Sequence, residues 1–135
     1  AQIRAAACEA ARRDAHAYCG LLAEAIFDAA GGDKEERGRR RAEWTRRCTE
    51  LPLQVAALAA EAGRLGAEAA AGVRAGAPSV QGDLDTGLAL LLTAGKVSLH
   101  TADVNMAGGS EMGALRERSG AIAASLAEVQ SLVQA

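Results

Sequence analysis

A single carboxylate within an apolar stripe is the first feature of this sequence that could do acid–base chemistry. Each residue of a helix turns by about 100°, and mostly apolar residues then fall within about 40° of Asp14: Ile3, Ala7, Tyr18, Leu21 and Ala25. Burial disfavours the charged form of a carboxyl group, so Asp14 should either be paired or have a raised pKa. A raised pKa suits proton transfer near neutral pH. The alternative is a structural carboxylate that pairs with an arginine or caps a neighbouring helix.

A second polar line follows in the segment from Asp83 to Ala107. Opposite Asp85, Lys96 and Asp103, small and polar residues fall within about 60° of one direction: Asp83, Gly87, Leu90, Ala94, Ser98, Thr101 and Asn105. A polar line with apolar flanks is typical of a helix that borders a ligand pocket. It is equally typical of interhelical hydrogen bonds and close helix approach. Asp83 would also serve as an N-cap or first-turn acid.

Seven basic residues lie between positions 34 and 47, interleaved with three glutamates. We expect most of this run to be a solvated helix face with local ion pairs. Arg37 and Arg41 differ, because they continue the spacing of Trp44, Cys48 and Leu51, and they are candidates to meet an anion in a cleft. The sequence contains no P-loop, dinucleotide fingerprint, G-x-S-x-G or HExxH motif.

Glycine and proline divide the chain into four helical segments that must position these residues. Glycine pairs at 31–32 and 108–109 are expected to end the first and third segments, and Ser110 to cap the fourth. Pro52 should kink or break the second segment. The expected helices cover residues 1–30, 33–75, 83–107 and 111–135, with a loop over 76–82.

Four long helices with short connections predict an all-α fold, an antiparallel bundle of about four long helices in a single domain over residues 1–135. Half of the residues are apolar and only 2% are aromatic, and the abundance of alanine favours helix. Two apolar stripes are expected to face neighbouring helices. They are Leu51, Val55, Leu58, Ala62, Leu65 and Ala69, and Leu115, Ser119, Ile122, Leu126, Val129 and Val133.

Charge and cysteine content exclude several classes. A net charge of −2 and a pI of about 5.7 do not favour nucleic acid or acidic membranes as partners. The longest strongly apolar run is too short to span a bilayer, and the first residues show no signal-peptide layout. We therefore expect a cytoplasmic protein with reduced, buried cysteines. Cys8 and Cys19 lie about 16 Å apart along one helix, too far to share a disulfide or a metal, and no metal is expected.

Four patches, in order, resemble an all-helical folate enzyme family, the formimidoyltetrahydrofolate cyclodeaminase and methenyltetrahydrofolate cyclohydrolase family. Asp-Ala-His-Ala-Tyr at 14–18 is similar to its Asp-Ala-Glu-Ala-Phe, and Asp-Lys-x-x-Arg at 33–37 to its Glu-Lys-x-x-Arg. The Leu-Pro-Leu at 51–53 is similar to its Val-Pro-Leu. Residues 76–83 and Thr-x-x-x-Asn-Met at 101–106 are similar to its Gly-Asn loop, Ser-Asp and Asn-Val-x-x-Asn-Leu.

The resemblance implies a homodimeric enzyme that acts on a one-carbon derivative of tetrahydrofolate without a metal. A cyclodeaminase, a lyase, closes a formimino group between N5 and N10 and expels ammonia. A cyclohydrolase adds water to the methenyl carbon. The family's catalytic Asp matches Asp14, which would act as general acid and base. The implied substrate-binding residues are Tyr18, Arg37, Asp83, Thr101 and Asn105. Arg37 or Arg41 would meet the acidic glutamate tail of folate.

The sequence also departs from the family pattern. The family's Gly-rich segment and the apolar helix after it are not in the numbered sequence, Thr101 replaces the first Asn, and His16 replaces a Glu. These departures keep a second function open, a non-catalytic bundle derived from this family that binds a small ligand or a protein partner. A purely structural bundle is a third possibility, and it requires Asp14 and Asn105 to be saturated by internal hydrogen bonds.

Overall fold

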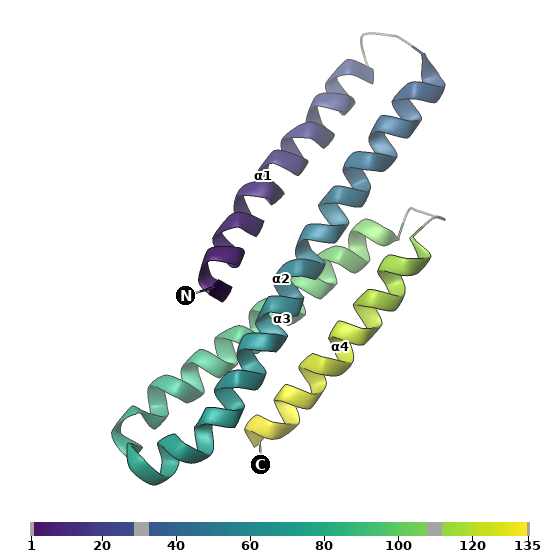
Figure 1. The fold of residues 1–135 in the computed structure, drawn as a ribbon. Helices are drawn as coiled ribbons and strands as arrows, with labels where there is room; N and C mark the ends of the chain where they lie inside the picture. Colours follow the sequence, from purple (N-terminus) through teal and green to yellow (C-terminus); the bar gives the residue numbers. More distant parts are fainter. Residues whose placement is uncertain (1, 29–32, 108–111, 135) are drawn as a thin grey trace.

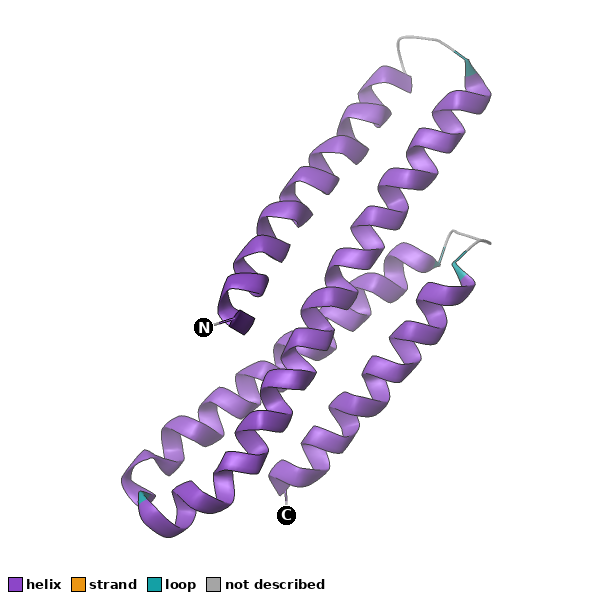
Figure 2. Ribbon diagram, viewed as in Figure 1, coloured by secondary structure: helices purple, strands orange, loops and turns teal. Residues whose placement is uncertain are grey.

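The structure, a computed structural model, describes residues 2–28, 33–107 and 112–134. Within these ranges it is helical, with one short 3₁₀ turn and no strand (Figures 1 and 2). The elements are α1 (Gln2–Asp28), α2 (Lys34–Gly76), η1 (Pro78–Val80), α3 (Gln81–Met106) and α4 (Gly113–Gln134). The predicted all-α bundle of four long helices is therefore confirmed. None of the helices described is long and apolar enough to cross a membrane.

The 43-residue helix α2 is the axis on which the other helices pack. Helix α1 runs antiparallel to the first half of α2 and contacts no other helix. Helices α3 and α4 pack on the second half of α2 and on each other (Figure 1). The bundle is therefore staggered, with a two-helix end and a three-helix end that overlap near the middle of α2.

Two apolar clusters reflect this stagger. The larger cluster joins α2, α3 and α4, and its members are mostly small or unbranched: Leu53, Ala56, Ala60, Leu99, Ala102, Met106, Met112, Ile122 and Leu126. The smaller cluster joins α1 and α2 through Ala17, Cys48 and Leu51, with Leu21 and Trp44 packed against it. Cys48 and Leu51 thus mark the level at which the two ends meet.

The predicted stripe of α4 is confirmed, whereas that of α2 is shifted. Ser119, Ile122, Leu126 and Val129 are buried in α4. In α2 the buried set includes Leu53 and Ala56, while Leu65, an expected core residue, is 47% exposed. Because three helices pack on α2 from different sides, no single stripe could describe its buried surface.

Several predicted ends of helices are tested. Helix α2 begins after Asp33, whose Oδ1 accepts the Glu35 backbone N–H at 3.0 Å, as an N-cap does. Helix α3 begins at Gln81, earlier than expected, because the turn η1 leads directly into it. Asp83 therefore lies in the first turn and is not the N-cap. The glycine pairs at 31–32 and 108–109 and the Ser110 cap lie outside the described residues.

Pro52 lies inside α2 without ending it. The helix is continuous from Lys34 to Gly76, so the predicted break does not occur, while the kink remains a prediction.

The carboxyl end of α3 is fixed by a hydrogen bond from α4. The Arg116 guanidinium of α4 donates to the Met106 carbonyl at 2.6 Å, which satisfies a carbonyl of the last turn of α3.

Candidate functional site

The candidate site is organised by the backbone carbonyl of Cys48. In a helix this carbonyl accepts the N–H of the residue four positions later, and that residue is Pro52, which has no N–H. The Asn105 side chain supplies the missing donor, because its Nδ2 donates to the Cys48 carbonyl oxygen at 3.0 Å. The last turn of α3 is therefore tied to the middle of α2 at this point.

Asp14 approaches the same residue from α1. Cys48 is only 8% exposed, and burial together with the negative charge of Asp14 raises the pKa of its thiol. Helices α1 and α3 do not contact each other. Asp14 and Asn105 thus come from two separate helices and both act on Cys48 of a third, Asn105 through a hydrogen bond and Asp14 through its charge.

Two further predicted residues lie one helical turn from these side chains. Tyr18 follows Asp14 by four residues on α1, and Thr101 precedes Asn105 by four residues on α3. The Thr101 hydroxyl donates to the Val97 carbonyl at 3.0 Å, so its oxygen lone pairs remain the groups that a ligand would meet. We call this set of Asp14, Tyr18, Cys48, Thr101 and Asn105 the Cys48 site.

The predicted burial of Asp14 is wrong for the single chain, in which Asp14 is exposed. Helix α1 has one neighbour, and its buried residues are Ala10 and Ala17. This contact line is turned by roughly 60° from Asp14, so much of the predicted stripe stays uncovered. Tyr18, for example, is 57% exposed.

The same rotation brings two charged residues of α1, Glu24 and Arg13, against α2. Glu24 is bonded to the Arg40 guanidinium at 3.1 Å, which raises the pKa of Arg40. Arg13 donates to the Gln54 side chain at 3.4 Å. The stripe on α1 was broad enough to fit either orientation, and these polar contacts select one of them.

The expectation that the polar line of α3 faces inward is also wrong. The buried residues of α3 lie on a side that is turned by about 110° from this line: Leu88, Gly95, Leu99, Ala102 and Met106. Asp83, Leu90, Ala94 and Thr101 are exposed, while Asn105 is half-buried at the edge. The small residues on the buried side allow close packing, since a Cβ added to Gly95 would lie 2.7 Å from Leu126.

Two predicted binding residues lie far from the Cys48 site. Asp83 is 22 residues before Asn105 on α3, which places it about 33 Å away at the other end of that helix. Arg37 is half-buried and lies 11 residues before Cys48, about 16 Å along α2. In one chain, Asp14 and Asn105 therefore both act on Cys48, and Tyr18 and Thr101 lie one turn away on their own helices, whereas Asp83 and Arg37 lie farther along α3 and α2.

The basic run of α2 is mainly a solvated face with local ion pairs, as predicted. Hydrogen bonds from Arg47 and Arg46 lower the pKa of Glu43, and Arg46 also pairs with Glu50. The Arg47 guanidinium lies 4.9 Å from the centre of the Trp44 ring. A charged groove between α1 and α2 is lined by Glu43, Arg46, Arg47 and Glu50 of α2, and Asp14 does not line it.

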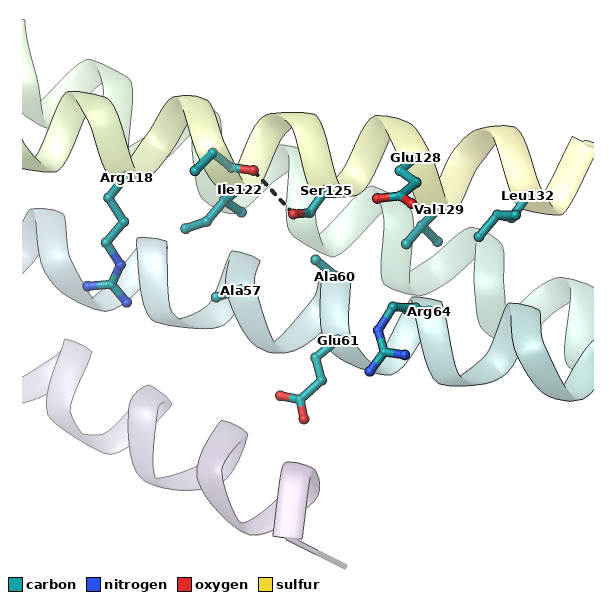
Figure 3. A pocket seen from close by; sticks show the side chains of 11 residues that line it. Ala57, Ala60, Glu61, Arg64, Arg118, Ile122, Ser125, Glu128, Val129 and Leu132 are labelled. Carbon is teal, nitrogen blue, oxygen red and sulfur yellow. Dashed lines mark hydrogen bonds between the residues drawn. The ribbon is translucent and has the colours of Figure 1, made fainter.

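A separate groove of about 320 Å³ lies between α2 and α4 (Figure 3). Its floor is apolar, with Ala57, Ala60, Ile122 and Val129, and Arg118 lies at one end. No predicted site residue lines it. Within the described residues there is also no group of three or more metal-ligating side chains.

Of the three cysteines, only Cys48 is buried; Cys8 and Cys19 are exposed, which corrects the expectation of three core residues. The role of the Cys48 carbonyl was not predicted either. The signal was in the sequence, because a proline inside a helix always leaves the carbonyl four residues earlier without its partner. The spacing alone does not predict the donor, Asn105, which lies 57 residues farther along the sequence.

The arrangement supplies a carboxylate that can accept or donate a proton and an amide oxygen that can accept a hydrogen bond. Comparison with known proteins identifies one relationship. A family model described as Formiminotransferase-cyclodeaminase matches residues 1–119, a range that includes the whole Cys48 site. The comparisons with curated proteins and with solved structures give no match.

Proposed function

Because the chain belongs to the formiminotransferase-cyclodeaminase family, we propose that its Cys48 site acts on a one-carbon derivative of tetrahydrofolate. The match of the family model to residues 1–119 confirms the family resemblance inferred from the four sequence patches. The observation that carries the proposal is that Asn105 of α3 is hydrogen-bonded to the Cys48 carbonyl and the charge of Asp14 of α1 acts on the Cys48 thiol, although α1 and α3 do not contact each other. We also propose that the protein is cytoplasmic, as expected from the sequence.

The proposed reaction is either of two proton-dependent steps. In a cyclodeaminase, N10 attacks the formimino carbon, its proton passes to the leaving nitrogen, and ammonia and a methenyl cation form with net uptake of one proton. In a cyclohydrolase, water adds to the methenyl carbon, one ring bond opens, and one proton is released. Asp14 is the general acid and base in both, because it is the carboxylate at the site.

Arg37 has a separate role in this proposal. It lies about 16 Å along α2 from Cys48, a position suited to the acidic tail of folate rather than to its one-carbon unit. Arg41 lies between them on the same side of α2. Replacing either arginine by alanine should weaken polyglutamyl-folate binding more than monoglutamyl-folate binding, and equal effects on both ligands would contradict this role.

A second copy of the chain is part of the proposal, because a single chain leaves the site open to water. The outer face of α3 carries Leu90, Val97 and Val104, which are 66, 60 and 58% exposed and spaced by seven residues. Apolar residues at this spacing form a seam for another helix. We propose that this helix is α3 of the second copy.

The position of Asp83 sets the register that we propose for this dimer. Asp83 and Asn105 lie 11 residues on either side of Ala94, so a two-fold axis at Ala94 between antiparallel α3 helices sets Asp83 of the partner subunit opposite Asn105. The dimer thus accounts for a binding residue that one chain places about 33 Å from the site.

A second candidate function is a folate-binding bundle without activity. The observation that favours it is the exposure of Asp14 in the single chain, since an open site does not exclude water from the reacting groups. In this case the second copy would not cover Asp14.

The test is a parallel assay of binding and turnover on the purified chain. Ammonia release is measured with 5-formiminotetrahydrofolate, ring opening with 5,10-methenyltetrahydrofolate, and binding of both by calorimetry. Turnover of either compound supports the enzyme. Binding without turnover supports the second candidate, and a chain that neither binds nor converts either compound contradicts both.

A further inference from the structure

Pro52 and Asn105 act together through the Cys48 carbonyl. The carbonyl belongs to a residue that is 8% exposed, and Pro52 is buried as well. A carbonyl that has lost its helical donor in such a place is costly unless another donor replaces it. The Asn105 Nδ2 at 3.0 Å is that donor.

This contact fixes which end of the Asn105 amide faces which way. An amide group that is free to rotate can present either its N–H groups or its oxygen to a ligand. Here Nδ2 is committed to the carbonyl, so Oδ1 is held as the acceptor. No hydrogen bond to Oδ1 is found among the described residues, and this oxygen is not among their buried unsatisfied atoms. It therefore reaches solvent beside Cys48, whose thiol pKa is also raised by the charge of Asp14.

We infer that Pro52 and Asn105 form a selectivity device, in which Pro52 orients the Asn105 amide so that Oδ1 accepts an N–H from the one-carbon unit of the substrate. This inference rests on the proposed function and adds to it a choice between the two substrates. A formimino group carries an N–H at the reacting end, and a methenyl group does not. An acceptor held in place at Asn105 therefore favours the formimino compound.

The orientation of Asn105 is tested first, without any substrate. Asn105→Ala should lower Tm by about 3–6 °C in the unaltered background, because a buried carbonyl loses its donor. In a Pro52→Ala background the new N–H of residue 52 serves that carbonyl, and the same substitution should cost much less. Ser119→Ala is the matched control, since the Ser119 hydroxyl makes another interhelical bond to α3, at 3.1 Å to Asp103. It should cost the same in both backgrounds.

Equal losses of Tm for Asn105→Ala in the two backgrounds would overturn the coupling between Pro52 and Asn105.

The selectivity between the two substrates is tested next by enzyme kinetics. Asn105→Ala should raise KM for 5-formiminotetrahydrofolate by about three- to tenfold, the value of one hydrogen bond, and leave KM for the methenyl compound within about twofold. Pro52→Ala, which keeps Asn105 but frees its amide, should shift the same KM in the same direction.

Equal changes of KM for both compounds, or no change for either, would overturn the selectivity. Failure of the proposed function looks different, because the unaltered protein would then bind and convert neither compound. In that event the selectivity falls with the function, and the Tm comparison alone decides whether Pro52 and Asn105 are coupled.

Discussion

Cys48 is the residue on which Asn105 and Asp14 both act. Its carbonyl holds Asn105, and its thiol lies within the electrostatic reach of Asp14. Neither contact requires the thiol to react. Burial and the charge of Asp14 both raise the pKa of the thiol, so we assign Cys48 a structural role, and the proposed proton transfer belongs to Asp14 alone.

The proximity of Asp14 to Cys48 predicts a reactivity pattern. At neutral pH, iodoacetamide should label Cys8 and Cys19, which are exposed, well before Cys48. Because the charge of Asp14 raises the pKa of the Cys48 thiol, Asp14→Asn should move the alkylation profile of Cys48 to lower pH. Mass spectrometry of the labelled peptides gives the rates. An unchanged profile in Asp14→Asn would show that the two groups do not interact.

The raised pKa of Cys48 also has a consequence for stability. The folded state holds the thiol proton more tightly than the unfolded chain does, so this contribution is fully present below the ordinary thiol pKa and is lost as pH rises through the folded value. Urea unfolding of Cys48→Ala, compared with the unaltered chain, should show a flatter alkaline limb. If both proteins lose stability in parallel above the ordinary thiol pKa, this linkage is absent.

At the scale of the elements, the contact between α1 and α2 depends on one glycine. Trp44 of α2 lies against the backbone of Gly20, and a Cβ at Gly20 would lie 2.6 Å from three atoms of the indole ring. Trp44 also meets His16, with ring centroids 5.8 Å apart. Since α1 has no other helical neighbour, this contact helps to set where Asp14 lies.

Gly20→Ala should therefore destabilise the protein by about 1–3 kcal/mol, because the indole must move. The matched control is Gly38→Ala, since nothing lies within 4 Å of a Cβ at Gly38, and replacing a helical glycine there should add up to about 1 kcal/mol. Urea unfolding followed by the fluorescence of Trp44, the single tryptophan, measures both. A neutral Gly20→Ala would mean that α1 does not dock on Trp44 as described.

The number of helices and most of their bounds followed from the sequence because glycine, proline and caps such as Asp33 act locally. The orientation of α1 on α2 could not be predicted from the sequence. The stripe around Asp14 was wide, and its true contact line was selected by Glu24 with Arg40 and by Gly20 with Trp44, which are tertiary contacts. The catalytic candidate was found from its periodicity, although the burial that made it a candidate is absent in the single chain.

At the scale of the whole molecule, the bundle leaves two apolar surfaces uncovered. One is the outer face of α3, and the other follows Tyr18, Leu22 and Ile26 of α1, which are 57, 45 and 72% exposed. Asp14 and Asn105 lie on the helices that carry these surfaces. A second copy that covers them would bury the Cys48 site and restore the low-dielectric surroundings that a single chain lacks.

The proposed two-fold axis at Ala94 predicts a specific cross-link. In a background with Cys8→Ser and Cys19→Ser, the variant Ala94→Cys should form a covalent dimer on mild oxidation, because the two Cβ atoms face each other at the axis. Ala89→Cys, exposed on another side of α3, should not. Non-reducing gels and sedimentation read the result. Equal cross-linking at the two positions, or a monomer at all concentrations, would rule out this dimer.

The most direct test of the central claim is the rate of ammonia release from 5-formiminotetrahydrofolate, and of methenyl ring opening, by Asp14→Asn against the unaltered protein. We predict a fall in kcat of about 10²- to 10⁴-fold, with the far-UV helical signal unchanged. Glu9→Gln, another exposed acid of α1, should keep its rate. An Asp14→Asn protein that converts either substrate as fast as the unaltered chain would contradict the account.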